Sequence, residues 1–191
     1  MAYAIKSKKT EADLSYLPIY GKVKDGREIT LVKYEDKHEA DVHEILRFIV
    51  NDEGNSYPQE DMTTVDDFRA YYLTHDVFVC IDKLTNEVLG AFYIKPNFPG
   101  RCSHICNAGF IVKKSVRGCG IGSFMTEQFL RLAKDIGYRA VFFNLVFVTN
   151  DTSLRMWRRF GFQEIGRVPN AGNLKGHGYT DALQFYYDLT K

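Results

Sequence analysis

The sequence predicts an α+β domain, with a mixed, mostly antiparallel sheet of about seven strands flanked by about four helices. The first half alternates short apolar runs with turn residues, which is typical of antiparallel strands. A Gly-rich turn then opens an amphipathic helix, and an almost uniformly apolar run follows. That order indicates one right-handed βαβ crossover. At 191 residues, the chain has room for one domain with extensions and not for two.

Composition narrows the class of protein. With 45% hydrophobic and 26% charged residues, the chain is neither disordered nor fibrous. Its net charge of +1 gives no reason to expect nucleic acid or an anionic membrane surface as a partner. The first residues, MAYAIKSKKTEADL, contain no apolar stretch long enough for a signal peptide, and no later window approaches the ~20 apolar residues that a membrane span needs. The expected protein is soluble and cytoplasmic, with mitochondria as the alternative.

The first elements are read from periodicity. Residues 1–27 show no sustained period and are expected to form an arm that packs on a domain spanning residues 28–191. That domain opens with a strand, a helix, a polar loop and a second helix, at 28–34, 36–52, 51–64 and 65–72. Thr64 can cap the second helix. The loop is a candidate wall of a substrate site.

A meander and the crossover follow. Three strands are expected at 77–81, 88–94 and 104–112, with Asn86 as the turn residue of the first hairpin. A helix with one apolar stripe begins near Ile121 and ends before Gly137. The later elements are a buried strand, a short helix and two further strands, at 140–148, 152–160, 162–168 and 181–189.

The turn before that helix reads Arg-Gly-Cys-Gly-Ile-Gly from Arg117 to Gly122. Glycines let a backbone approach a ligand closely, and successive amides at a helix N-terminus can bind phosphate oxygens. The turn lacks the spacing of a dinucleotide fingerprint and the Lys-Ser/Thr ending of a P-loop. A tight turn that uses glycine for geometry alone is the alternative.

This run fits the Arg/Gln-x-x-Gly-x-Gly/Ala signature, and with the element order it resembles the GNAT superfamily of acyl-coenzyme A N-acyltransferases. The resemblance implies a GNAT fold and acetyl-CoA as cosubstrate, with the pyrophosphate on the turn and the pantetheine between two splayed strands. It places cofactor contacts at Ile111, Val112, Arg117, Gly118, Cys119, Gly120, Ile121, Gly122, Ser123 and Asn150.

Five blocks from about residue 56 onward, SYPQ, GAFYIKPN, RCSHICNAGF, FNLVFVTN and VPNAG, resemble the yeast N-acetyltransferases of azetidine-2-carboxylate. This implies acetyl transfer to a small cyclic imino acid, such as azetidine-2-carboxylate, cis-4-hydroxyproline or a proline-pathway intermediate, and detoxification of proline analogues by a homodimer. The arm does not share the resemblance. The resemblance implies that Asn107 and Asn144 are catalytic. It also implies substrate contacts at Asn107, Phe110, Asn144 and Leu145.

The side-chain chemistry of these residues agrees in part with the roles that the resemblance implies. An amide is no base at neutral pH, so Asn107 is expected to position the nucleophile or to donate a hydrogen bond to the developing oxyanion. The amine proton would leave through water or a backbone carbonyl, or the site would select the neutral amine. Asn144 is either a substrate contact or a satisfied core amide. Trp157 stands where most of the family has a tyrosine acid, and an indole is no acid, so packing is its simplest role.

The cysteines do not indicate a metal. Cys102, His104 and Cys106 alternate, but three ligands on one strand lie too far apart to wrap one tetrahedral ion. With Cys80 and Cys119, the cysteines are expected to be free thiols, and no metal is predicted.

Two other functions stay open. The first is acetylation of another amine, such as a polyamine, an amino acid or a peptide N-terminus. A polyamine would need an acidic pocket, which Asp52, Glu53, Glu60 and Asp61 could supply. The second is a non-catalytic module that binds acyl-CoA. It is favoured because many members of the family place a glutamate base near the position of Asn107, and this chain lacks both that base and the tyrosine acid.

Overall fold

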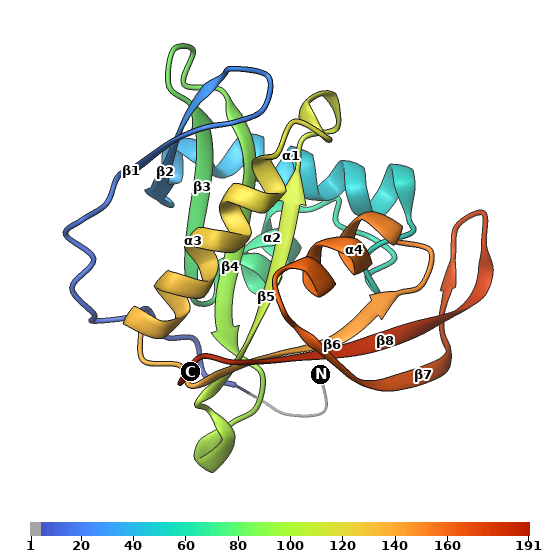
Figure 1. The fold of residues 1–191 in the computed structure, drawn as a ribbon. Coiled ribbons are helices and arrows are strands. Elements are labelled where there is room, and N and C mark those ends of the chain that lie inside the picture. Colours follow the sequence, from blue (N-terminus) through green and yellow to red (C-terminus); the bar gives the residue numbers. More distant parts are fainter. Residues whose placement is uncertain (1–4) are drawn as a thin grey trace.

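The computed structural model describes residues 5–191 and contains one eight-stranded sheet in the order β1-β2-β3-β4-β5-β6-β8-β7 (Figure 1). The strands are β1 Ile19–Lys22, β2 Glu28–Lys33, β3 Asp76–Asp82, β4 Val88–Pro96, β5 Ile105–Val112, β6 Ala140–Phe147, β7 Gln163–Leu174 and β8 Gly178–Asp188. The α-helices are α1 Glu39–Arg47, α2 Val65–Tyr72, α3 Ile121–Asp135 and α4 Asp151–Arg159. The predicted α+β class with a mostly antiparallel sheet is confirmed.

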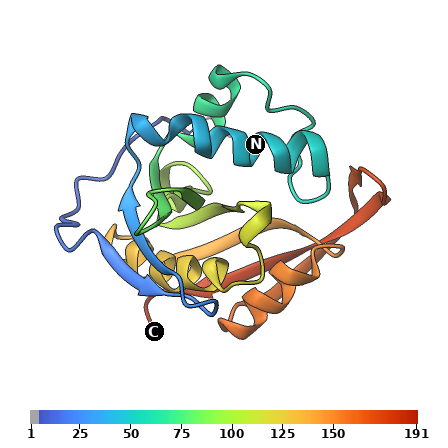
Figure 2. The same cartoon turned by 90° about the horizontal axis from the view of Figure 1, so that it is seen from above.

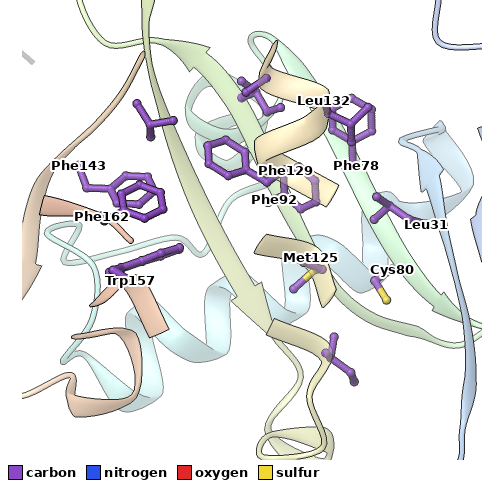
Figure 3. Packing of buried hydrophobic residues seen from close by; sticks show 14 of the residues in the cluster. Leu31, Phe78, Cys80, Phe92, Met125, Phe129, Leu132, Phe143, Trp157 and Phe162 are labelled. Carbon is purple, nitrogen blue, oxygen red and sulfur yellow. The ribbon is translucent and has the colours of Figure 1, made fainter. Parts of the chain in front are cut away.

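Helices cover both faces of the sheet. Viewed from above, α1 and α2 lie on one side, and α3 and α4 lie on the other (Figure 2). The core is divided accordingly: one cluster contains Phe68 and Tyr72 of α2 with Tyr93 of β4. A second cluster contains Phe129 of α3 and Trp157 of α4, as Figure 3 shows, and a third, smaller one lies between β6, β7 and β8. Because strand side chains alternate between faces, each residue of the central strands faces one helical layer or the other.

The strands β5 and β6 part soon after they meet. They are the one parallel pair in the sheet that residues 5–191 form, and they pair only at Ile105 with Ala140 and at Cys106 with Val141. Beyond these residues the two strands diverge (Figure 1). The inner edges of β5 and β6 therefore carry backbone groups without ladder partners, which a ligand could use.

Several local predictions are confirmed. The helix expected at 36–52 is a short 3-10 turn, α1 and a π-helical turn at Phe48–Glu53. Thr64 caps α2 by accepting a hydrogen bond from the Asp67 amide. Asn86 adopts a φ of 60° in the β3–β4 turn.

Three expectations need correction. Residues 1–27 were expected to form an arm that packs on the domain, yet β1 in this segment pairs with β2 at the sheet edge and is the eighth strand of the sheet. The strand expected at 162–168 runs on to Leu174, because irregularities in its register carry it past Pro169. Cys102 lies in a 3-10 turn before β5, so it does not share a strand with Cys106.

The four cysteines are free, as expected. In residues 5–191 no group of His, Cys, Asp or Glu side chains is arranged to hold a metal ion. The same residues contain no helix that is both long and apolar enough to cross a membrane.

Candidate functional site

The Gly-rich turn ends as the N-terminus of α3. Gly120 is the N-cap residue, with a φ of 101°, and no side chain caps the helix. The first amides of α3 are therefore left for another acceptor, at the positive end of the helix dipole. A Cβ on Gly118 would meet nothing within 4 Å, and one on Gly122 would only touch the Met156 sulfur at 3.6 Å. The turn is open toward solvent along these glycines.

The β1–β2 turn supports the Gly-rich turn from behind. The Lys24 amide donates to the Cys119 carbonyl at 3.0 Å. A Cβ on Gly120 would lie 3.5 Å from the Lys24 side chain. A hydrogen bond with Asp25 raises the pKa of the Cys119 thiol, which disfavours a reactive thiolate. The arm thus fixes the shape of the turn, a role that the sequence did not reveal.

Two arginines lie at this helix end. Arg117 makes a two-pronged ion pair with Glu53, at 2.7 and 2.9 Å, and donates through Nε to the Val112 carbonyl at 3.2 Å. Arg159, at the end of α4, donates to the Ser123 hydroxyl at 2.6 Å. Sequence reasoning missed Arg159, because only the packing of α4 against α3 brings it to the turn.

Asn150 lies between β6 and α4. Its Oδ1 accepts a hydrogen bond from the Ser153 amide at 3.1 Å, so it caps α4 and keeps its Nδ2 group free. Ile111 and Val112 close β5 just before the Gly-rich turn; the Ile111 side chain is buried against α1 and α2. The expected cofactor residues therefore line a path from the open edge of β5 to the start of α3.

Asn107 lies on β5 where that strand leaves β6. It pairs in register with Lys95 of β4, so both side chains project toward the α1 and α2 layer. Its Oδ1 accepts from the adjacent Ala108 amide at 2.8 Å. The carbonyl of this amide is thereby engaged, and the Nδ2 group remains to donate to a ligand.

Asn144, on β6, lies on the same face of the sheet as Asn107 and has a partner that sequence reasoning missed. Asn144 and Leu145 lie at a register shift between Phe143 and Val146, where β6 carries one more residue than β8. The Asn144 amide exchanges two hydrogen bonds with Asn97, at 2.6 and 3.0 Å. Asn97 is buried and follows β4 directly, inside the GAFYIKPN block. Nothing local in the sequence marks Asn97 as buried, because a polar residue at a strand end is usually exposed.

Tyrosines from the α2 side cover β5. Tyr57 donates to the Phe110 carbonyl at 3.1 Å, and Tyr72 donates to the Gly109 carbonyl at 3.0 Å. Tyr93 crosses Gly109 so closely that a Cβ there would lie 2.5 Å from its ring. Burial raises the pKa of Tyr57, Tyr72 and Tyr93, which keeps these hydroxyls as donors. They form an aromatic wall beside Asn107.

Phe110 and Trp157 lie on the other face of β5. The Phe110 ring packs 5.3 Å from Trp157, and Trp157 is 4.5 Å from Phe143, measured between ring centroids (Figure 3 labels the latter two). Trp157 is buried, which agrees with a packing role. The structure therefore brings Asn107 and Asn144 to one face and places the Phe110 ring on the opposite one.

The sequence matches the model of the acetyltransferase (GNAT) family over residues 40–162. The chain belongs to the acetyltransferase (GNAT) family. It is 38% identical over 171 residues to the N-acetyltransferase aca1 of Schizosaccharomyces pombe, with 79% of this chain and 82% of that protein covered. The chain is accordingly an N-acetyltransferase that depends on acetyl-CoA.

Solved structures agree on the fold of this acetyltransferase. A GCN5-related N-acetyltransferase from Kribbella flavida has a TM-score of 0.79 and 28% identity, and the match covers 84% of this chain and 97% of that one. The acetyltransferase yncA of Salmonella typhimurium, solved with acetyl-CoA, has a TM-score of 0.74 at 17% identity, and the match covers 84% and 94% of the two chains.

Proposed function

We propose that this GNAT enzyme transfers the acetyl group of acetyl-CoA to the nitrogen of a small cyclic imino acid, such as azetidine-2-carboxylate, and so detoxifies proline analogues. One observation carries the proposal. Asn107 and Asn144, the asparagines that the resemblance to azetidine-2-carboxylate acetyltransferases makes functional, come from different strands and reach one face where β5 and β6 part. An aromatic wall beside them suits a small, apolar ring.

For the cosubstrate, we assign the pyrophosphate to the first amides of α3 and the turn before it. Uncapped amides and Arg159 give that helix end a positive character that suits phosphate oxygens. Arg117 lies there too, with its charge offset by Glu53. The pantetheine would follow the unpaired edge of β5 at Ile111 and Val112, with Asn150 across the gap on the β6 side.

The reaction is a direct attack in a ternary complex. The lone pair of the neutral acceptor nitrogen forms a bond to the acetyl carbonyl carbon, and the carbon–sulfur bond then breaks to release the CoA thiolate. The Nδ2 group of Asn107 donates to the oxygen that becomes negative. The amine proton leaves through water or a backbone carbonyl, since neither asparagine can accept it.

The polar loop at 51–64 argues against a polyamine as the acceptor. Asp52 pairs with Arg47, Glu53 pairs with Arg117, and Asp61 accepts hydrogen bonds from Asn51 and Thr63. These three carboxylates are engaged by the protein itself, and the fourth of the set, Glu60, is an exposed side chain. An acceptor with several ammonium groups would find little negative charge here.

A homodimer is part of the proposal. The strand β7 is the last in the sheet order, and the β7–β8 hairpin carries the exposed side chains of Ile165 and Tyr179. An unpaired edge strand with apolar side chains is a natural surface for pairing with a second copy. Light scattering at micromolar concentration should give twice the chain mass, and a monomer would refute this part.

The test of the acceptor is release of CoA thiol with a panel of amines. Azetidine-2-carboxylate and cis-4-hydroxyproline should give turnover, identified as N-acetyl products by mass spectrometry. Spermidine and a peptide N-terminus should give little. Turnover with a polyamine and none with either imino acid would refute the proposed acceptor and leave the acetyltransferase activity standing.

A further inference from the structure

Lys95 is a buried lysine on the acceptor side of the sheet. It is the penultimate residue of β4 and only 5% exposed. Its register partner is Asn107, which places the two Cβ atoms about 5 Å apart on the same face. The flexible stem of a lysine can move its ammonium by several ångströms. A molecule held at Asn107 therefore lies within reach of this charge.

The surroundings of Lys95 are aromatic and neutral. Its ammonium lies 4.4 Å from the centre of the Tyr71 ring and 4.1 Å from that of Tyr93. The one hydrogen bond it makes within residues 5–191 goes to the Tyr71 carbonyl, at 3.2 Å. Ring faces attract a cation, but they leave two of its three N–H groups without a strong acceptor.

Lys95 has no counter-ion in the part of the chain that the structure describes. It takes part in no ion pair, and burial alone lowers its pKa to about 8. The other titratable groups facing it are Tyr71, Tyr93 and His75. The pKa of His75 is lowered, mainly by burial and to a smaller extent by the charge of Lys95. Buried charges in proteins are normally paired, because desolvation costs several kcal/mol per ion.

A purely structural role accounts poorly for this residue. A methionine has nearly the same length, fits between two tyrosines and avoids the desolvation cost. The unpaired cation beside Asn107 has a clear use if its anion arrives with the substrate. The phosphates of the cosubstrate do not qualify, since their proposed site lies at the N-terminus of α3, past the far end of β5.

We propose that Lys95 binds the carboxylate of the acceptor and so selects amines that carry a carboxylate next to the reacting nitrogen. This rests on the proposed imino-acid acceptor and deepens it. The carboxylate completes the ion pair that the protein leaves open, while Asn107 and Asn144 contact the amine and the reacting carbonyl. The charge also disfavours polyamines by repulsion.

The experiment measures acetylation by two forms of the enzyme, each with two pairs of acceptors. Wild type and Lys95→Met are assayed with azetidine-2-carboxylate and azetidine-2-carboxamide, and with alanine and alaninamide. Each pair differs in the carboxylate, and differences in amine pKa cancel when the two enzymes are compared. Lys83→Met, which removes an exposed lysine paired with Glu28, is the charge-matched control. Lys95→Arg tests whether the charge suffices.

We expect wild type to prefer the acid over the amide, and Lys95→Met to reduce that preference by about tenfold or more, through KM. Lys83→Met should keep the preference, and Lys95→Arg should keep part of it. An equal loss of kcat with acid and amide would overturn the proposal and make Lys95 a proton acceptor. A wild type without preference would also overturn it, even if azetidine rings are acetylated.

The two proposals can fail separately. If the enzyme prefers alanine to alaninamide and azetidine-2-carboxylate is inert, the proposal of a cyclic acceptor is refuted. The proposal that Lys95 binds the carboxylate is then still supported. If no acceptor reacts, ¹³C NMR of Lys95 decides, with the signal assigned by its loss in Lys95→Met. A carboxylate of the panel should raise its titration midpoint in the presence of CoA. An unmoved midpoint overturns the carboxylate site.

Discussion

Asn97 and Asn144 are joined by two reciprocal amide hydrogen bonds, at 2.6 and 3.0 Å, that link the end of β4 to the middle of β6. The bonds span the place where β5 leaves β6. They fix the plane of the Asn144 amide and leave one Nδ2 hydrogen and one Oδ1 lone pair for a ligand. Asn97 is thus a positioning residue for the acceptor site.

Replacing Asn97 by alanine should release Asn144. We expect kcat/KM for the acceptor to fall by about tenfold, since one or two hydrogen bonds of about 1 kcal/mol each are lost. The Kd for acetyl-CoA, measured by calorimetry, should not change. Asn97→Asp restores only the acceptor half of the pair and should recover part of the activity. A variant that only melts earlier, with normal kinetics, would assign the pair to stability.

Asn107→Asp should separate a hydrogen-bond donor from a base. The aspartate keeps an oxygen for the Ala108 amide but loses the Nδ2 donor and adds negative charge near the oxyanion. We expect kcat to fall by about a hundredfold or more, with acetyl-CoA affinity little changed. Single-turnover kinetics measure the chemical step. Activity at the parent level would mean that a general base was what the site lacked.

Gly122→Ala should weaken acetyl-CoA binding without harming the fold. An added Cβ meets only the Met156 sulfur, at 3.6 Å. Alanine also has a higher helix propensity than glycine. We expect Kd to rise about tenfold, because a methyl group blocks close approach of the pyrophosphate, while Tm holds or rises. Gly120→Val would not separate binding from folding as well, because the φ of 101° at Gly120 strains the backbone of any residue with a side chain. Unchanged titration by Gly122→Ala would refute the assigned turn.

Glu53→Gln should change the charge available at the turn. The carboxylate neutralises Arg117 through two contacts, at 2.7 and 2.9 Å. With a neutral amide there, acetyl-CoA should bind a few-fold more tightly at low salt, and the gain should shrink as salt rises. Arg117→Ala should weaken binding a few-fold. If Glu53→Gln weakens binding as much as Arg117→Ala does, the glutamate instead holds the arginine in place.

Lys95 should make stability depend on pH. Its folded pKa of about 8 is below the usual 10.5, so between these values the unfolded chain binds more protons than the folded one. The contribution of Lys95 to stability should therefore rise from pH 8 toward 10. The thiols of Cys80 and Cys106, whose folded pKa is raised by burial, and the tyrosines oppose it as they ionise in the unfolded chain, so the difference between wild type and Lys95→Met isolates the lysine. Urea midpoints of Lys95→Met should lack this rise. Parallel curves for the two proteins would mean that the Lys95 pKa is not lowered.

The fold class and most of the helices and strands could be predicted from the amino-acid sequence alone. Single residues or short motifs mark the starts of helices and the turns. Examples are Thr64 at a helix start, Asn86 at a tight turn, and the glycines from 118 to 122 before an apolar stripe. These features act over a few residues, so they can be read without a partner. The motif at the turn and its spacing also led to the family.

How distant segments meet could not be predicted in this way and is seen only in the folded protein. The strand β1 was hidden because an edge strand of four residues has too little period to read, and its turn supports Cys119 from nearly a hundred positions away. Asn97 and Lys95 carried no local signal, since a polar residue at a strand end is usually exposed. Their burial, and their places beside Asn144 and Asn107, follow from strand register and the parting of β5 from β6, which depend on the whole sheet.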